Sequence, residues 1–276
     1  MDKMLVFIDL DNIYRGLVEH YGVEPIENEF NMFEIIRNYQ KEKGNQISEI
    51  IAFGDFDKMG SNSFKTNLAM EGIQPKDVFS TNSTIKRKNA SDIQLSIYAV
   101  DCAFHLNDVN KYLFISADAD MIPIISYLKG NGHRKQVSLY VLEKQANVRV
   151  LEKFPNDEFS TLEKILSLKE PEIISDEIIE SNQKLLVHRI LITEQYNIKS
   201  KRDRQYYTMD GYKWNEMRFL KLGEKRLNGK DMDKIIKSLQ DKEIIFVKYN
   251  PNLKSEEIIL NRENKIVQGV LEKFID

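Results

Sequence analysis

The 276-residue sequence contains a single cysteine, Cys102, which limits the kinds of protein it can encode. One thiol excludes an intramolecular disulfide and a cysteine-rich zinc site. No apolar run is long enough to span a bilayer, and the first residues show no secretory signal pattern. We therefore expect a protein without a membrane partner, with the cytoplasm as the default location.

The sequence also has no large excess of charge of either sign, because it contains 40 Lys and Arg and 43 Asp and Glu, and its formal net charge is −3. Any affinity for nucleic acid must therefore be local. The sequence has neither a Gly-x-Gly-x-x-Gly turn nor a P-loop lysine, which argues against dinucleotide and nucleoside-triphosphate binding. The remaining composition, 42% hydrophobic and 30% charged, is typical of a globular protein.

Short apolar, β-prone runs alternate with helical patterns through the first 165 residues. This alternation favours a parallel sheet with helices on both faces. The clearest helix is predicted over residues 91–106, with Ser91 as its N-cap. In this helix, spacings of three and four predict a buried face made of Ile93, Ile97, Val100 and Phe104. The predicted strands are 5–8, 47–53, 77–80, 111–115 and 136–142.

The amino-acid composition of the chain changes near residue 172. Helices are predicted over 173–195, 212–222 and 229–239, and two strands follow at 244–249 and 258–260. Three helices followed by a β-hairpin is the element order of a winged helix, and other helix-rich accessory domains give similar patterns. We therefore predict two domains, 1–165 and 172–276, of which the second is mostly helical.

Carboxylates occur where predicted elements of the first domain meet. Asp9 ends the first strand, Asp92 starts the helix 91–106, and Asp118 and Asp120 follow the strand 111–115. Because ligands of open α/β sheets bind beyond the carboxyl ends of the strands, these side chains are expected at one rim. Crowded carboxylates repel one another, and a hard cation such as Mg²⁺ relieves this repulsion and can stabilise charge on a phosphate.

Each of these acids also has an ordinary structural alternative. Asp11 or Asn12 could cap the first helix, and Asp92, Asp118 and Asp120 could serve as caps or first-turn acids. Asp9 is harder to explain in this way, because a carboxylate beside a buried strand must be paired, hydrated or metal-bound. The conjunction of the sites favours a functional interpretation.

Three segments resemble the signatures of NYN domains of the LabA-like type. They are Phe-Ile-Asp-Leu-Asp-Asn (7–12), Ser-Asp-Ile-Gln-Leu-Ser-Ile (91–97) and Ile-Ser-Ala-Asp-Ala-Asp-Met-Ile-Pro-Ile-Ile (115–125). The third is the most specific, since the family shows Ser-Gly-Asp-Ser-Asp-Phe-x-Pro-Leu there. The resemblance covers residues 1 to about 165 and implies a PIN-like three-layer α/β/α sandwich with a parallel sheet. Characterised members are metal-dependent ribonucleases with an acidic pocket.

The resemblance marks Asp9, Asn12, Asp92, Asp118 and Asp120 as catalytic by position. It implies that Asp9, Asp92 and Asp118 hold Mg²⁺ or Mn²⁺, directly or through water. Asp120 would complete the pocket or position a water, and Asn12 would orient Asp9 or a phosphate. The implied reaction is hydrolysis of RNA phosphodiesters to a 5′-phosphate and a 3′-hydroxyl.

Two departures from the family pattern set up an alternative. Tyr98 stands where members often have a further Asp, with Asp101 as a substitute three residues on, and Ala117 replaces the usual glycine. The chain could therefore be a non-catalytic RNA-binding or regulatory protein that has lost full metal binding. A metal-dependent phosphatase or DNA nuclease is a third hypothesis, because an acidic pocket alone does not determine which phosphate ester is the substrate.

Basic residues suggest where nucleic acid would bind. Lys86, Arg87 and Lys88 precede Asp92 and could hold substrate phosphates. In the second domain, basic residues beside aromatics suit single-stranded nucleic acid: Lys199, Lys201, Arg202, Arg204, Tyr206 and Tyr207. Lys221, Lys225, Arg226 and Lys230 form another basic stretch.

The overall charge of the second domain is weak, since residues 172–276 hold 20 Lys and Arg against 18 Asp and Glu, a net of +2. A charge run is usually a solvated face. A winged helix also serves protein contacts or dimerisation, and a homodimer is compatible with this sequence.

Overall fold

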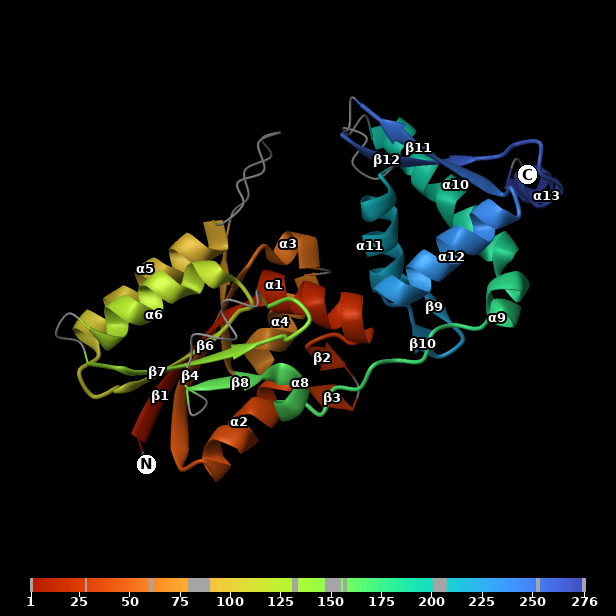
Figure 1. The fold of residues 1–276 in the computed structure, drawn as a ribbon. Coiled ribbons are helices and arrows are strands. Elements are labelled where there is room, and N and C mark those ends of the chain that lie inside the picture. Colours follow the sequence, from red (N-terminus) through yellow and green to blue (C-terminus); the bar gives the residue numbers. More distant parts are fainter. Residues whose placement is uncertain are drawn as a thin grey trace. The chain divides into compact units, whose positions relative to one another are not determined.

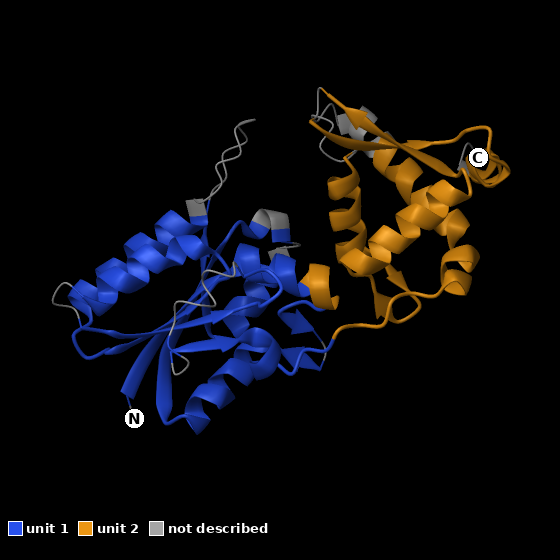
Figure 2. Ribbon diagram, in the orientation of Figure 1, with its two compact units in different colours: residues 1–17, 23–169 blue, residues 18–22, 170–276 orange. Residues whose placement is uncertain are grey.

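The computed structural model describes residues 2–27, 29–59, 62–78, 90–130, 134–146, 155, 158–200, 208–251 and 254–274. The chain forms two compact units (Figure 2). Unit 1 comprises residues 1–17 and 23–169, and unit 2 comprises residues 18–22 and 170–276. Among the helices that the structure describes, none has the length and apolar character needed to cross a membrane.

Unit 1 is built on a six-stranded parallel sheet in the order β5-β4-β1-β6-β7-β8 (Figure 1). The central strand β1 is buried at every position from Met4 to Asp9, as expected for a parallel strand covered on both faces. The predicted α/β architecture with a parallel sheet is therefore confirmed. The strands are β1 (Asp2–Asp9), β4 (Asn45–Gly54), β5 (Ile73–Asp77), β6 (Lys111–Ile115), β7 (Gln136–Val141) and β8 (Phe159–Thr161).

Helices cover both faces of this sheet (Figure 1). On one face, α5 (Ala90–His105) and α6 (Ile122–Lys129) enclose a core that includes Phe7 and Phe114, whose rings stack 5.3 Å apart. The remaining elements of unit 1 are α1 (Leu10–Gly16), β2 (Ile26–Glu27), β3 (Phe30–Asn31), α2 (Met32–Glu42), α3 (Phe56–Met59), α4 (Asn62–Met70), the 3-10 turn η2 (Ala119–Met121) and α8 (Leu162–Ile165). The π-helical turn η1 (Leu17–Tyr21) follows α1 and, apart from Leu17, belongs to unit 2.

The third strand was predicted at residues 77–80, but β5 spans Ile73–Asp77, so the prediction overlaps the strand at Asp77 alone. Val78 follows the strand, and residues 79 and 80 lie outside the described residues. Pro75 lies within β5, and proline normally argues against a strand because it has no N–H to donate. β5 is an edge strand, paired with β4 alone, so a missing donor is tolerated there.

The buried face predicted for helix α5 is wrong at three of its four residues, and the fourth, Val100, is partly buried against the core. Ile93, Ile97 and Phe104 are 61%, 65% and 58% exposed. The helix carries a second stripe with similar spacing, and this stripe packs on the sheet: Asp92, Leu95, Ala99, Cys102 and Ala103. Small residues in this stripe allow a close approach to the strands. Ser91 lies inside the helix, which begins at Ala90, so it is not the N-cap.

The described part of unit 2 contains three longer helices followed by a two-stranded antiparallel hairpin, in the predicted order. A short hairpin lies between the second and third of these helices, and a terminal helix follows. The elements are α9 (Asp176–Ser181), α10 (Gln183–Ser200), α11 (Met209–Phe219), β9 (Lys221–Leu222), β10 (Lys225–Arg226), α12 (Gly229–Asp241), β11 (Ile245–Asn250), β12 (Ser255–Leu260) and α13 (Lys265–Phe274).

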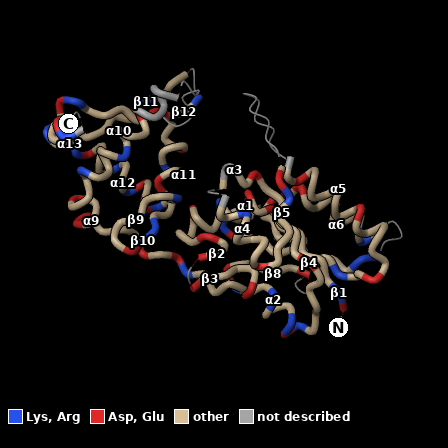
Figure 3. Tube along the Cα trace, turned by 180° about the vertical axis from the view of Figure 1, so that it is seen from behind, with Lys and Arg blue, Asp and Glu red and all other residues tan. Residues whose placement is uncertain are grey.

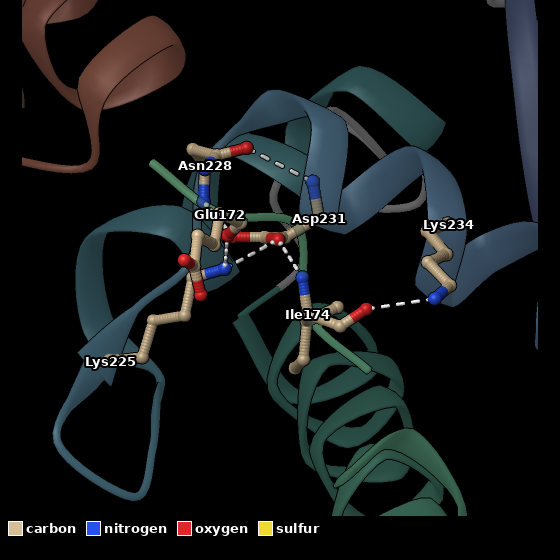
Figure 4. A network of polar contacts seen from close by, with 6 residues as sticks. All are labelled: Glu172, Ile174, Lys225, Asn228, Asp231 and Lys234. Carbon is tan, nitrogen blue, oxygen red and sulfur yellow. Dashed lines mark hydrogen bonds and ion pairs between the residues drawn. The ribbon is translucent and has the colours of Figure 1, made fainter. Parts of the chain in front are cut away.

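A buried carboxylate joins the start of unit 2 to helix α12 (Figure 4). Asp231 and Asn228 form a capping box, in which each side chain accepts a hydrogen bond from the other's backbone N–H. Asp231 also accepts from the Ile174 N–H at 2.7 Å and from the Lys225 ammonium at 2.8 Å. The Asp231 carboxylate therefore accepts hydrogen bonds from Ile174, Lys225 and Asn228. These bonds hold the chain around Ile174 against helix α12.

Charges of both signs are interspersed along the described trace of each unit (Figure 3). Most of the second basic stretch of unit 2 is engaged internally. Lys225 pairs with Asp231, Lys230 pairs with Glu170 at 3.1 Å, and Arg226 donates to the Arg218 carbonyl. The two ion pairs reduce the charge available to a nucleic acid partner, whereas the carbonyl contact restricts the Arg226 side chain without neutralising it.

Candidate functional site

The site lies where the order in which strands are added to the sheet changes direction. From β1 the chain adds β4 and β5 on one side and then β6, β7 and β8 on the other (Figure 1). The reversal therefore falls at the neighbouring carboxyl ends of β1 and β6, the place where open α/β sheets bind ligands. Asp9 is the last residue of β1, and Ser116 directly follows β6.

Asp9 is 3% exposed, and groups on α1 and beyond β6 donate hydrogen bonds to its carboxylate. Its Oδ1 accepts from the Asn12 N–H at 3.4 Å, and its Oδ2 accepts from the Ser116 hydroxyl at 3.2 Å. Asp9 is thus the N-cap of α1, a role that the sequence had suggested for Asp11 or Asn12. Burial, and then the negative charges of Asp92 and Asp11, raise the pKa of Asp9 to about 8.

Asp92, on the first turn of α5, is the second buried carboxylate of the site, with 8% exposure. Burial and the charges of Asp118 and Asp120 raise its pKa, while a hydrogen bond with the Asp9 carboxyl group acts in the opposite sense. Its Oδ1 is buried without a hydrogen-bond partner among the described residues. A buried carboxylate oxygen without a donor is energetically costly unless something else binds it.

Asp118 and Asp120 form the outer part of the site. Asp118 is half-buried and caps the turn η2 by accepting the Asp120 N–H at 3.0 Å. Its own N–H donates to the Ser116 hydroxyl oxygen at 3.1 Å, so Ser116 links Asp118 to Asp9. Asp120 is exposed.

Asn12 connects the same two strand ends. Its Oδ1 accepts the Ala117 N–H, just beyond β6, at 3.3 Å, while its own N–H binds Asp9. The five predicted residues therefore belong to one linked group, either through hydrogen bonds or through the electrostatic coupling of Asp9 and Asp92 with their acidic neighbours.

Two contributors were missed by sequence reasoning. Asp11 accepts the Asp55 N–H at 3.1 and 3.2 Å with its two oxygens, and its charge acts on Asp9. The sequence had left it as a cap or surface residue. Ser116 had no assigned role, although its position at the end of β6 gave a signal.

The departures from the family pattern have clear positions. The Tyr98 ring packs edge-on against Phe53 at 5.8 Å. Asp101 is an exposed residue paired with His105 at 3.1 Å, and it is not among the charges acting on Asp9 or Asp92. Ala117 does not have a positive φ, so its side chain introduces no backbone strain where the family has glycine.

The chemistry of these side chains fits a divalent cation in part. Two buried carboxylates whose pKa values are raised by burial and by neighbouring negative charges, one of them with an orphaned oxygen, provide the oxygen ligands that Mg²⁺ prefers, and Mg²⁺ uses one or two carboxylates with several waters. No group of three or more Asp, Glu, His or Cys side chains within the described ranges is close enough to enclose an ion. The fit is therefore to a site with few protein ligands.

Comparison with known proteins supports the same conclusion about the fold. The NYN domain family matches residues 3–163, which is more than half of the chain. The chain belongs to the NYN domain family. NYN domains have a PIN-like nuclease-type fold and are generally nucleases.

Other comparisons of this NYN protein add little. A Vibrio parahaemolyticus protein of unknown function has a similar structure, with a TM-score of 0.45 and 14% identity over 60% of this chain and 95% of that chain. No curated protein matches with significance.

Several candidate binding residues of the NYN protein lie outside the described residues. They are Lys86, Arg87 and Lys88 ahead of α5, and Lys201, Arg202, Arg204, Tyr206 and Tyr207 after α10.

Proposed function

We propose that this NYN protein is a metal-dependent ribonuclease, an endonuclease that hydrolyses RNA phosphodiesters at the carboxyl ends of β1 and β6. The observation that supports this most is the pair Asp9 and Asp92. Both are buried, each has a raised pKa because of burial and neighbouring negative charge, and Asp92 Oδ1 has no donor among the described residues. Such an arrangement is unfavourable in isolation and is typical of functional sites.

Asp9, Asp92 and Asp118 are the residues proposed to hold Mg²⁺ or Mn²⁺, with Asp118 at the more open side, directly or through water. When bound, the ion would neutralise these carboxylates and stabilise negative charge that develops on a phosphate. Ser116 and Asn12 hold Asp9 in one orientation, because both donate hydrogen bonds to it. Asp120, which is exposed, would accept a hydrogen bond from the attacking water and so position it.

The test is cleavage of labelled structured and unstructured RNA by the purified chain, with Mn²⁺ or Mg²⁺ and with EDTA. We expect cleavage that requires the metal and leaves a 5′-phosphate and a 3′-hydroxyl. Asp9→Asn and Asp118→Asn should each lower the rate by more than about 100-fold, which exceeds the usual effect of residues outside the ligand shell.

Asp101→Asn is the matched control, because Asp101 lies on the same helix as Asp92 but is exposed and paired with His105. It should cleave like the wild type. Undiminished metal-dependent cleavage by both Asp9→Asn and Asp118→Asn would contradict the assignment of the site. Single-stranded and duplex DNA in parallel reactions would reveal a DNA nuclease, and a phosphomonoester would reveal a phosphatase.

A non-catalytic RNA-binding or regulatory role is the second candidate. It is favoured by Tyr98, which places an aromatic ring where relatives often carry an acid, and by the lack of a three-ligand cluster in the described structure. This role predicts RNA binding that is indifferent to divalent metal and no cleavage of any substrate.

We also propose that the region from residue 172 onward is a winged-helix-like domain that contacts single-stranded nucleic acid. Its support is the order of its elements and an aromatic-cationic group on α11. The Arg218 guanidinium lies 4.6 Å from the centre of the Phe219 ring, and Phe219 is 59% exposed. Exposed rings beside cations suit base stacking. The third signature supports the LabA-like subtype.

A further inference from the structure

Gln145 lies in the turn after β7, far in sequence from every residue assigned to the site. Only one orientation of its side-chain amide satisfies its neighbours. In that orientation the nitrogen donates to the backbone oxygen of Asn12 and to Asn12 Oδ1, each at 3.2 Å, and Gln145 Oε1 accepts from the Gly16 N–H at 3.2 Å. One side chain therefore binds both the main chain and the side chain of Asn12.

The fit between Gln145 and helix α1 is close. A Cβ atom built on Gly16 would lie 2.4 Å from Gln145 Cδ and 2.6 Å from Leu142 Cδ1, distances that no real contact allows. Glycine at position 16 is therefore what lets the amide reach the helix. Leu142 and Gly16 are both buried, so the contact between the turn after β7 and helix α1 lies in the protein interior.

This contact bears on how the Asn12 side chain is oriented. Asn12 Oδ1 receives two donors, the Ala117 N–H at 3.3 Å and the Gln145 amide at 3.2 Å. An asparagine amide has one acceptor oxygen and one donor nitrogen on opposite sides of the same carbon. With Oδ1 fixed by two donors, the amide cannot flip, and its Nδ2 is presented on the other side.

We infer that Gln145 is a positioning residue that acts through Asn12, holding the Asn12 amide so that Nδ2 serves as a hydrogen-bond donor to the phosphate of the substrate. The inference rests on the proposed ribonuclease function for its effect on rate. The structural part of the inference is that Gln145 holds Asn12 Oδ1 against the Ala117 N–H, and this part does not depend on the proposed function.

The test uses the full chain with Gln145→Ala, Asn12→Ala and the double variant. Gln145→Ala should lower kcat about 10-fold, the usual size of outer-shell effects, with KM changed less than about twofold. In the Asn12→Ala background the same change should alter kcat by less than about twofold, because the residue it acts through is gone. Glu143→Ala, an exposed position in the same turn, is the control and should behave as wild type.

Amide hydrogen exchange at Ala117 gives a readout that needs no activity. Gln145→Ala should speed exchange there about 10-fold, whereas Glu143→Ala should not. Gln145→Glu keeps the acceptor for the Gly16 N–H but loses the donors, so it should reproduce the effect and covers the case in which the alanine variant fails to fold. Unchanged exchange at Ala117 in Gln145→Glu, or an equal loss of kcat in both backgrounds, would overturn the inference. If the wild type cleaves no RNA, the proposed function fails and the exchange at Ala117 alone decides on Gln145.

Discussion

The buried carboxyl group of Asp9 should make the metal-free protein less stable as pH rises. Its pKa is raised from an ordinary 3.8 to about 8, so the folded state holds a proton that the unfolded chain releases. A group whose folded pKa is raised contributes its stability fully below the unfolded pKa and loses it as pH rises through the folded pKa. The expected loss therefore runs from about pH 4 to pH 8.

The size of the effect follows from the two pKa values. The difference between 3.8 and about 8 sets a ceiling of roughly 6 kcal/mol, since each pKa unit is worth about 1.4 kcal/mol. Relaxation of the protein and entry of water around the charged carboxylate lower this ceiling. We expect about 2–3 kcal/mol between pH 5 and pH 8, a large share of a typical unfolding free energy of roughly 5–15 kcal/mol.

Asp9→Asn isolates this contribution, because asparagine resembles the protonated acid and does not titrate. Urea unfolding in EDTA would be measured for both proteins from pH 5 to pH 8.5, and the difference in unfolding free energy taken at each pH so that other titrations cancel. Circular dichroism is preferable to tryptophan fluorescence, because the single tryptophan, Trp214, lies in unit 2. Asp9→Asn should gain about 2–3 kcal/mol on the wild type across this range.

A stability difference that stays constant with pH would refute the raised pKa, and a difference that shrinks as pH rises would reverse its sign. Mn²⁺ offers an internal check on the wild type. A cation binds the deprotonated carboxylates, so saturating metal should remove most of the pH dependence.

Two further predictions concern stability. Asp231→Ala should lower the unfolding free energy of unit 2 by about 3 kcal/mol in urea titrations followed by Trp214 fluorescence, because the buried acceptor of the Ile174 N–H and the Lys225 ammonium is lost; a loss below about 1 kcal/mol would mean that water replaces this carboxylate. On α5, Leu95→Ala should cost about 2–4 kcal/mol by circular dichroism, whereas Ile97→Ala should cost less than about 1 kcal/mol, and the opposite ranking would restore the buried face predicted from the sequence.

Much of unit 1 could be predicted because its signals are local. The apolar runs that end at Asp9 and Ile115 are strands in the structure, and Pro123 stands in the first turn of α6, as its fixed φ allows. The rim location of the carboxylates followed from strand direction alone, since parallel strands end at one edge. These inferences needed no knowledge of distant contacts.

The errors arose where a tertiary contact decides between equal local choices. Helix α5 carries two apolar stripes, and only the packing of Ala99 and Ala103 against the sheet determines which one is buried. Gln145 has no distinguishing pattern around it, because its partner Asn12 is more than a hundred residues away. The role of Asp11 depends in the same way on the Asp55 N–H beyond β4.

From the sequence, capping and catalysis are alternative roles for the acids at these strand ends, and the structure shows that a capping acid can also belong to the carboxylate group. Asp9 caps α1 and Asp118 caps η2, yet both belong to the group of carboxylates at the carboxyl ends of β1 and β6. A carboxylate offers about four lone-pair directions, and a cap uses one of them. The capping bond also restricts the side chain to one rotamer, which a ligand of a metal or a water requires. An acid at a strand end that also caps a helix is thus better suited to bind a ligand than an acid without such a hydrogen bond. In such sequences a capping role and a functional role are therefore compatible.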